Sequence, residues 1–377
     1  MVIKNKTIKI ILKSLLIALL TIIVIVSGYA VYFVSSFTRI DDNLSLAPTN
    51  ADEKALAQTN TNYNLLSWNI GFCSYSADFS FFMDGGKYSR AFSKDAVDAN
   101  LKGITDTIPS MSKNYLNSKP FDFICYQEVD FDSTRSYHVD LRNQLTKYHT
   151  GYSSTFAQNY DSPYIMYPLT SPHGANKSGL LTLSKFQITS SIRKQLPIEN
   201  GFTKFFDLDR CYSKNRIAVN NGKELVIYNL HLSAYTSDGT IAIEQLKVLL
   251  ADCKEEVEQG NFVICAGDFN KDLIDSEGGS AKLFGQDEAS ENWAKQIDLT
   301  IFENTGMTKI APCLNSDPVP TCRNANAPYS EGNKVYVVDG FLVSSNIAVL
   351  KATTADEQFK YSDHNPVILT FQLINKI

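Results

Sequence analysis

The feature that most limits how this chain can fold is an uncharged apolar run near its N-terminus. The 25 residues from Ser14 to Thr38 contain no charged side chain and are mostly Leu, Ile, Val, Ala, Phe and Tyr. A helix of about 20 such residues spans the hydrocarbon core of a bilayer. The run therefore predicts one transmembrane helix over residues 14–38, and the rest of the chain must fold outside the bilayer.

The charges on either side of the run indicate its orientation. Four lysines precede it in a basic stub, residues 1–13, and no Asp or Glu occurs before Asp41. By the positive-inside rule the N-terminus is cytoplasmic and the body is extracellular. A cleaved signal peptide is the alternative, because Gly28-Tyr29-Ala30 resembles a cleavage site. The apolar run continues through Val34, which favours an uncleaved anchor and a single-pass protein of the cell membrane.

The chain beyond the run divides into a polar segment and one large domain. Residues 39–61 are polar and lack dense apolar periodicity, so we expect a juxtamembrane linker there and a folded domain over residues 62–377. Residues 1–40 hold five of the 35 Lys and Arg and none of the 40 Asp and Glu, which leaves a net charge of −10 on the remainder. A body this acidic is not a basic nucleic-acid clamp, and a phosphate substrate would need a separate cation.

Short β-rich segments separated by turn residues recur from Tyr63 onward, with a few helical stretches between them. We predict strands at 65–69, 121–127, 179–183, 216–219, 225–230, 262–266, 335–343 and 367–373. We predict helices at 93–108, 140–145 and 241–260. Many strands with peripheral helices favour two packed sheets with helices outside them.

Polar side chains recur where these strands end. The segments LLSWN, FICYQE, VIYNLHL, VICAGDFN, YVVDGF and YSDHNPV place eight of them at or beside strand ends: Asn69, Glu128, His231, Asp268, Asn270, Asp339, Asp363 and His364. One such residue usually only begins a turn. Six such segments in one chain indicate a central active site lined by both sheets.

In this order, WN, QE, NLHL, GDFN, VDGF and SDHNPV resemble the endonuclease/exonuclease/phosphatase superfamily, the DNase I-like metal-dependent phosphoesterases. The resemblance covers the chain from Leu65 to Leu373. It implies an α/β fold, a four-layer sandwich of two central mixed β-sheets flanked by helices, here preceded by the transmembrane helix. It also implies an enzyme that hydrolyses phosphate esters with Mg²⁺ or Mn²⁺.

The resemblance implies a metal and substrate site at one end of these strands. Glu128 would hold the metal, as suits a hard cation that prefers carboxylate oxygen, and Asp363 would join its shell. Asn69 would orient Glu128 and reach the phosphate. Arg216 lies on a strand before NLHL, where the family often binds phosphate, although a solvated Arg is an equal alternative. Arg135 follows QEVD and would bind substrate phosphate, with a plain polar loop as the alternative.

The resemblance also implies the residues that carry the chemistry. Asp268 would position or activate the attacking water, and Asn270 would donate to a phosphoryl oxygen. Asp339 would hydrogen-bond His364, so that His364 acts as general base or as a positive partner of the phosphate. His231 would stabilise the developing charge or protonate the leaving oxygen.

The substrate class stays open between several possibilities. The anchor disfavours an intracellular repair nuclease, and we expect a monomeric surface nuclease, with nucleic acid favoured over phospholipid as the partner. A sphingomyelinase-like phospholipid hydrolase or another phosphate-ester hydrolase is the alternative, and a catalytically silent surface binding domain is the second. The aromatic stretch Phe79 to Met83 could stack on bases, enter a lipid interface or pack the domain's own edge.

The chain has seven cysteines, so at least one has no intramolecular partner. Cys125 and Cys265 lie in apolar runs and are expected in the core. Cys313 and Cys322 flank a Pro-containing loop, and the sequence leaves open whether they form a disulfide in an external domain.

Overall fold

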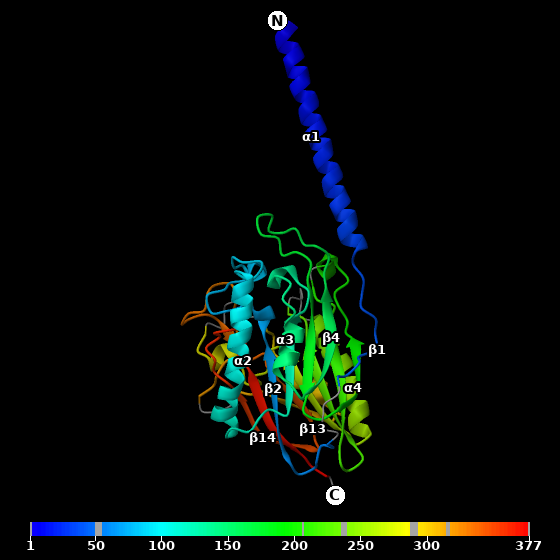
Figure 1. Cartoon of the computed structure of the whole chain (residues 1–377), viewed down its shortest axis with the longest axis vertical. Helices are drawn as coiled ribbons and strands as arrows, with labels where there is room; N and C mark the ends of the chain where they lie inside the picture. Colours follow the sequence, from blue (N-terminus) through cyan, green and yellow to red (C-terminus); the bar gives the residue numbers. More distant parts are fainter. Residues whose placement is uncertain are drawn as a thin grey trace.

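The computed structural model describes residues 2–49, 55–205, 207–234, 240–286, 293–313 and 317–375, so residues 50–54 of the expected linker lie outside it. Helix α1 (Val2–Ser35) stands away from a body built on two large sheets (Figure 1). Its stretch Asn5–Ser35 contains an 18-residue window with a mean hydropathy of 2.8 and is long and apolar enough to cross a membrane. A signal sequence near the N-terminus meets the same criterion.

The body contains two mixed sheets and a short ribbon. The strands of the first sheet are β1 (Leu44–Ser45), β6 (Ile188–Gln195), β7 (Cys211–Ala218), β8 (Glu224–His231), β9 (Phe262–Asp268), β10 (Met307–Ile310) and β13 (Asp339–Ser344). The strands of the second are β2 (Asn62–Asn69), β3 (Phe123–Asp130), β4 (Ser153–Asp161), β5 (Lys177–Ser184), β14 (Ile347–Thr354) and β15 (Val367–Leu373). The ribbon pairs β11 (Cys322–Arg323) with β12 (Val335–Tyr336). The strand orders are β1-β6-β7-β8-β9-β13-β10 and β14-β15-β2-β3-β5-β4.

Each large sheet contains a parallel pair whose strands are joined by a crossover helix. Helix α2 (Lys94–Leu116) connects β2 to β3, and α4 (Thr240–Glu258) connects β8 to β9. Parallel strands begin at one edge of a sheet and finish at the other. Asn69 is accordingly in register with Gln127, and His231 with Asp268. The polar strand ends of each sheet are thus collected at one edge.

The layers follow from the alternation of side chains along the strands. On β2, Leu65 packs in the core between the two sheets, where it joins Ile227 of β8. On the other face of β2, Trp68 lies in the cluster under α2 and α3 (Leu141–Tyr148). Leu249 of α4 packs on the outer face of the other sheet. The order helix, sheet, sheet, helix confirms the predicted four-layer α/β sandwich.

The three predicted helices and eight predicted strand segments correspond to elements of the structure, with the segment 335–343 divided between β12 and β13. Strands β1, β4, β6, β10, β11 and β14 were not predicted. In β4 the sequence SSTFAQNYD is polar, yet Thr155 is buried between the sheets and its Oγ1 donates to Asn215 Oδ1 at 2.6 Å. Polar side chains that satisfy each other across a sandwich give no hydropathy signal. All seven cysteines are buried free thiols, so Cys313 and Cys322 are not bridged.

Part of the segment expected to be a linker is attached to the body. Leu44 and Ser45 form β1 against Arg193 and Ile192 of β6. Arg39, just after α1, forms an ion pair with Asp209. An edge strand offers unpaired backbone groups, so a polar segment can join it without any apolar periodicity.

Candidate active site

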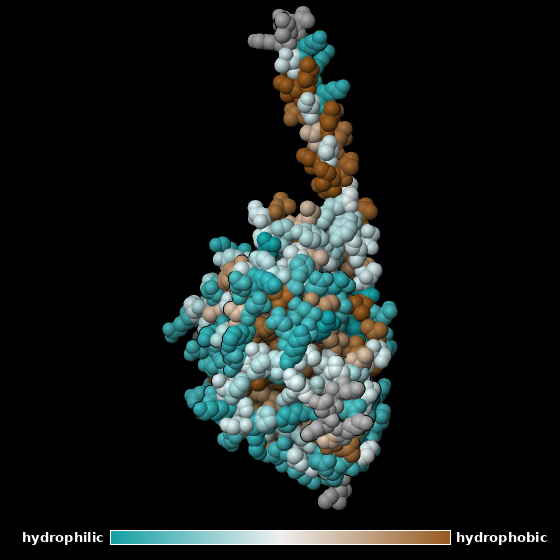
Figure 2. All heavy atoms as spheres, in the orientation of Figure 1, coloured by the Kyte–Doolittle hydropathy of each residue, from teal (hydrophilic) through white to brown (hydrophobic). Residues whose placement is uncertain are grey.

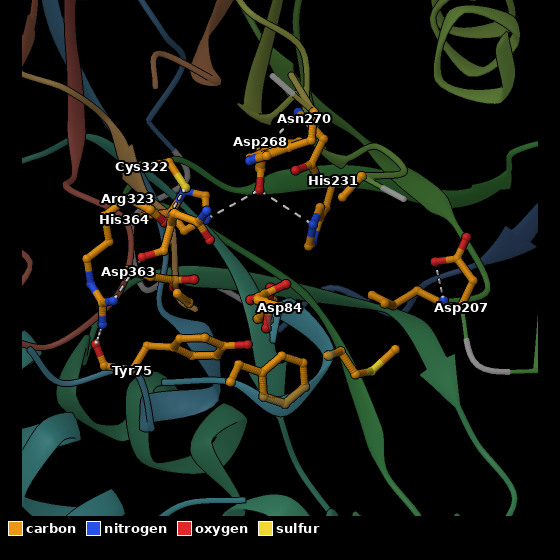
Figure 3. Close-up of a pocket in the computed structure, with 18 of the residues that line it drawn as sticks. Tyr75, Asp84, Asp207, His231, Asp268, Asn270, Cys322, Arg323, Asp363 and His364 are labelled. Carbon is orange, nitrogen blue, oxygen red and sulfur yellow. Dashed lines mark hydrogen bonds and ion pairs between the residues drawn. The ribbon is translucent and has the colours of Figure 1, made fainter. Parts of the chain in front are cut away.

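A pocket of about 880 Å³ opens where the polar ends of both sheets meet (Figure 3). Seven of the predicted site residues line it: Glu128, Arg135, His231, Asp268, Asn270, Asp363 and His364. Two others contact this group directly, because Asn69 Nδ2 donates to Asp268 Oδ2 at 3.1 Å and Asp339 contacts His364. The structure therefore brings together residues that lie as far apart in sequence as Asn69 and His364.

Strand register brings the catalytic candidates of the first sheet together. The central strand β9 ends at Asp268, which is in register with His231 of β8 on one side and with Asp339 of β13 on the other. Side chains in register on adjacent strands point to the same face and lie close together. His231 Nε2 is consequently 3.5 Å from Asp268 Oδ2.

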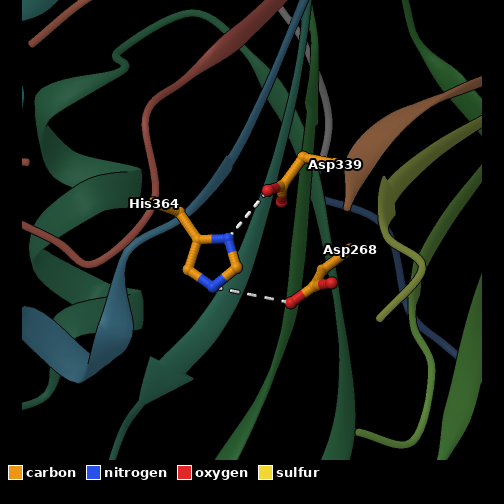
Figure 4. Close-up of side chains that lie close together, drawn as sticks. All are labelled: Asp268, Asp339 and His364. Atoms are coloured by element: carbon orange, nitrogen blue, oxygen red, sulfur yellow. Dashed lines mark hydrogen bonds and ion pairs between the residues drawn. The ribbon is translucent and has the colours of Figure 1, made fainter. Parts of the chain in front are cut away.

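His364 is held between two carboxylates (Figure 4). Its Nδ1 is hydrogen-bonded to Asp339 Oδ2 at 2.8 Å, and its Nε2 lies 3.7 Å from Asp268 Oδ2. Burial lowers the pKa of His364, but the carboxylate of Asp339 and its other acidic neighbours outweigh this and raise the pKa well above the ordinary value. The bond to Asp339 fixes the ring so that Nε2 faces the pocket.

Asp268 contacts four neighbouring residues at the wall of the pocket. Its Oδ1 accepts the backbone N–H of Asn270 at 2.8 Å, while Oδ2 faces Asn69 and both imidazoles. Burial and the nearby Asp339 raise the pKa of Asp268 to about 7, and His364 opposes that shift. A carboxylate with such a pKa can take up and release a proton near neutral pH.

His231 differs electrostatically from His364. Burial and the charge of Arg210 lower its pKa well below the ordinary value, so this imidazole is neutral at pH 7. Its Nδ1 is buried and has no hydrogen-bond partner among the described residues. Of the two histidines beside Asp268, His364 thus favours the protonated form and His231 the neutral form. This difference suits them to different roles in one reaction.

Two further carboxylates, Glu128 and Asp363, line another part of the pocket. Asn69 Nδ2 donates to Glu128 Oε1 at 3.2 Å. Burial raises the pKa of Glu128, Arg135 opposes this, and the nearby Asp363 raises it further. Burial also raises the pKa of Asp363. For both carboxylates burial outweighs the nearby positive charges, and an all-oxygen pair of this kind suits a hard divalent cation.

The two arginines predicted to bind substrate lie in different places. Arg135 lines the pocket, and its guanidinium makes two hydrogen bonds to buried Asp130, at 3.0 and 2.8 Å. Arg216 instead forms ion pairs with Glu224 and Glu256, and it is not among the residues that line the pocket. The structure therefore does not bring Arg216 to this pocket, because its strand carries it away from the site.

Arg210 lines the pocket and was missed by the sequence analysis. Its Nη1 lies 3.4 Å from the backbone oxygen of His231, and it forms an ion pair with Asp207 at 3.0 Å. Strand β7 runs antiparallel to β8, with Tyr212 opposite Leu230. The residue near His231 must therefore come from the start of β7, where Arg210 lies, and this hairpin geometry was the available signal.

The aromatic stretch also has a defined place. Phe79 and Phe81 are buried in a cluster with Phe72, so they pack the edge of the domain. Phe81 and Met83 also border the pocket.

Comparisons with known proteins agree with this fold. The sequence profile of the Endonuclease/Exonuclease/phosphatase family matches residues 66–364. Among solved structures, the chain is similar to an endonuclease/exonuclease/phosphatase from Beutenbergia cavernae DSM 12333, with a TM-score of 0.55, 17% identity, and 83% of this chain and 72% of that chain covered. It is also similar to ANGEL2, a 2′,3′-cyclic phosphatase solved with adenosine-2′,3′-vanadate, with a TM-score of 0.53, 15% identity, and 87% and 98% covered.

A search of curated protein sequences found no match to this chain. At such low identities the solved structures establish the fold alone. The family profile covers most of the chain, including each of the six polar strand-end segments at least in part. The chain therefore belongs to the endonuclease/exonuclease/phosphatase family.

Proposed function

We propose that this protein is a membrane-anchored, extracytoplasmic phosphodiesterase that uses Mg²⁺ or Mn²⁺ to direct water onto phosphorus. The observation that carries the proposal is the position of Asp268 between two imidazoles of opposite charge preference. The membrane anchor is supported by α1, whose Tyr29 and Phe33 contact the body. Cleavage after Ala30 would remove Tyr29 and its contact.

Glu128 and Asp363 are the residues that would hold the metal. When bound, the ion would polarise the phosphoryl oxygens and offset their negative charge. Asp268, Asp339 and His364 also offer ligand atoms within 4.8 Å of one another. In that group, however, His364 Nδ1 is already hydrogen-bonded to Asp339. These three side chains therefore lie close together because they form a chain that handles protons.

The remaining residues supply proton transfer and charge stabilisation. Asp268 would accept a proton from the attacking water as the new bond to phosphorus forms. As the old bond breaks, Asp268 would pass that proton to the leaving oxygen, which His231 Nε2, 3.5 Å from Asp268 Oδ2, would stabilise by a hydrogen bond. The His364 imidazolium would face the developing phosphoryl charge through Nε2. Asn270 Nδ2 already donates to Leu232 O at 2.7 Å and retains one N–H for a phosphoryl oxygen.

Hydrolysis of bis-p-nitrophenyl phosphate by the full chain in detergent tests this proposal. Activity should require Mg²⁺ or Mn²⁺ and disappear with EDTA. Asp268→Asn should reduce kcat about 10²-fold or more, the range of a general acid–base contribution. Asp106→Asn is the matched control, because Asp106 is exposed on α2. Metal-independent activity, or full activity of Asp268→Asn, would refute the mechanism, and no hydrolysis of any ester would favour a silent binding domain.

A further inference from the structure

The outer end of α1 is attached to the β4–β5 connection, residues 162–176. Tyr29 Oη donates to Tyr164 O at 3.0 Å and lies 3.2 Å from Met166 N. Tyr32 Oη accepts from Tyr164 N at 3.1 Å. A helix rises about 1.5 Å per residue, so a hydrocarbon core of about 30 Å that begins at Lys13 ends near residue 33. The β4–β5 connection is therefore held at the level of the outer membrane interface.

This connection exposes large apolar side chains. Tyr167 is 66% exposed and Leu169 is 82% exposed, and Met166 is also exposed. Figure 2 shows hydrophobic side chains at the end of the body nearest α1. Tyr and apolar residues at this depth are typical of segments that enter a membrane interface.

The pocket lies at the same end of the body as this connection. The end of β3 pairs with the start of β5, with Asp130 opposite Ser178, and the end of β4 pairs there too, with Asp161 opposite Lys177. Glu128 enters the pocket from that end of β3. The β4–β5 connection is thus beside the pocket and not at the opposite end of the sheets.

The connection between β6 and β7 also places the pocket at the end of the body nearest α1. The Phe205 ring lies 5.8 Å from that of Phe33 and 5.1 Å from that of Phe37, at the outer end of α1. Asp207 and Arg210, a few residues later, line the pocket. Both of these connections therefore contact the end of α1 and border the active site.

Apolar surface continues from the membrane side to the pocket wall. The ring of Phe82 lies 5.8 Å from the ring of Tyr167 and 5.6 Å from that of His173. The next residue, Met83, is exposed and lines the pocket. A lipid whose head group occupied the pocket would have an apolar path to the bilayer.

We propose that the pocket faces the membrane surface and that its substrate is a phosphoester carried by a membrane lipid. This inference rests on the proposed membrane anchor and esterase activity, and it reverses the preference for nucleic acid inferred from the sequence. A polyanionic nucleic acid would need a basic surface, whereas the chain after residue 40 has 30 basic and 40 acidic residues. A lipid in the same bilayer as α1 needs no such surface, because the tether keeps it at a high effective concentration.

A depth measurement tests the docking of the connection. The seven native cysteines are buried, so an environment-sensitive thiol dye will label Leu169→Cys and the control Asn221→Cys selectively. Asn221 lies in the turn between β7 and β8, at the opposite end of the sheets. In full chain reconstituted in phosphatidylcholine/phosphatidylglycerol vesicles, the dye at 169 should shift to the blue and be quenched by spin-labelled lipid, unlike the dye at 221. Equal signals, or a shift that depends on protein density, would overturn the inference.

A paired activity assay tests the substrate class. The double variant Tyr167→Ser/Leu169→Ser should hydrolyse soluble bis-p-nitrophenyl phosphate as the parent does. It should lose at least about tenfold in head-group release from the same vesicles, because burial of even one such side chain is worth about that factor. Leu350→Ser removes an exposed leucine of β14 and should alter neither rate. Cleavage of plasmid DNA without hydrolysis of vesicle lipid would overturn the inference. No hydrolysis of the soluble ester would instead refute the proposed function, while the depth measurement would still decide the docking.

Discussion

Replacing Asp339 by Asn isolates the contribution of the carboxylate behind His364. The substitution keeps the shape of the side chain but removes the charge that faces His364 Nδ1 at 2.8 Å. Both side chains are almost fully buried. Loss of one partner of such a buried pair costs about 3–5 kcal/mol. If the charged imidazole is needed in the transition state, kcat should fall about 10²- to 10⁴-fold.

The pH dependence of the same variant gives an independent measurement. Asp339 raises the pKa of His364, so Asp339→Asn should lower that pKa. The activity that depends on protonated His364 is lost as pH rises through its pKa, and the alkaline limb of the kcat profile should move to lower pH. We expect the metal concentration for half-maximal activity to stay within about threefold, since Asp339 is assigned to the proton-handling chain.

The assay is hydrolysis of bis-p-nitrophenyl phosphate by the full chain at saturating Mg²⁺, with thermal unfolding measured in parallel. Asp106→Asn removes the charge of an Asp that pairs with Lys102 on the exposed face of α2, and should change kcat by less than about twofold. A kcat of Asp339→Asn close to that of the parent would refute the reasoning. A loss that is restored by raising the metal concentration would identify Asp339 as a metal ligand instead.

Four other substitutions probe separate parts of the structure. Glu128→Gln should raise the metal concentration for half-maximal activity about tenfold or more, with activity partly restored at high metal; an unchanged metal titration would move the ion elsewhere. Arg210→Lys should raise KM for the ester about tenfold, because a charged hydrogen bond is lost. Arg216→Lys should lower the Tm without changing KM. If KM rose in Arg216→Lys and not in Arg210→Lys, the role first expected for Arg216 would be restored. Burial lowers the pKa of His149 to about 4. Below about pH 6.5 the unfolded chain therefore binds more protons at this residue than the folded chain does. The free energy of unfolding should consequently fall by about 3 kcal/mol for this residue as pH falls from 6.5 to 4. His149→Gln, which can keep the bond to Tyr126 Oη, should flatten that part of the Tm-against-pH curve, and a curve with unchanged slope would contradict the assignment.

The sequence by itself determined the elements that depend on local pattern. An uncharged run of 25 residues forms a helix in any surroundings that lack water, so α1 was predictable. The strands that end in Asn69 and Asp268 are apolar on both faces, because each lies between another sheet and a helix. Their polar ends interrupt that pattern, and most of the candidate site can therefore be recognised in the sequence alone.

The tertiary structure decided everything that depends on register and on distant contacts. Asp339 and His231 approach Asp268 because β13 and β8 flank β9 in a particular register, which no local pattern specifies. The antiparallel pairing of β7 with β8 likewise puts Arg210 in the pocket, while Arg216 lies six positions further along the strand.

Hydropathy did not predict β4, because some of its buried side chains are polar. Thr155, for example, hydrogen-bonds a partner 60 residues away in sequence. The orientation of the pocket relative to α1 could not be predicted either, because it too depends on contacts between residues that are distant in sequence. It depends on hydrogen bonds between Tyr29 or Tyr32 and a connection more than 130 residues distant. A sequence displays which side chains a region offers, but only the folded chain specifies which of them meet.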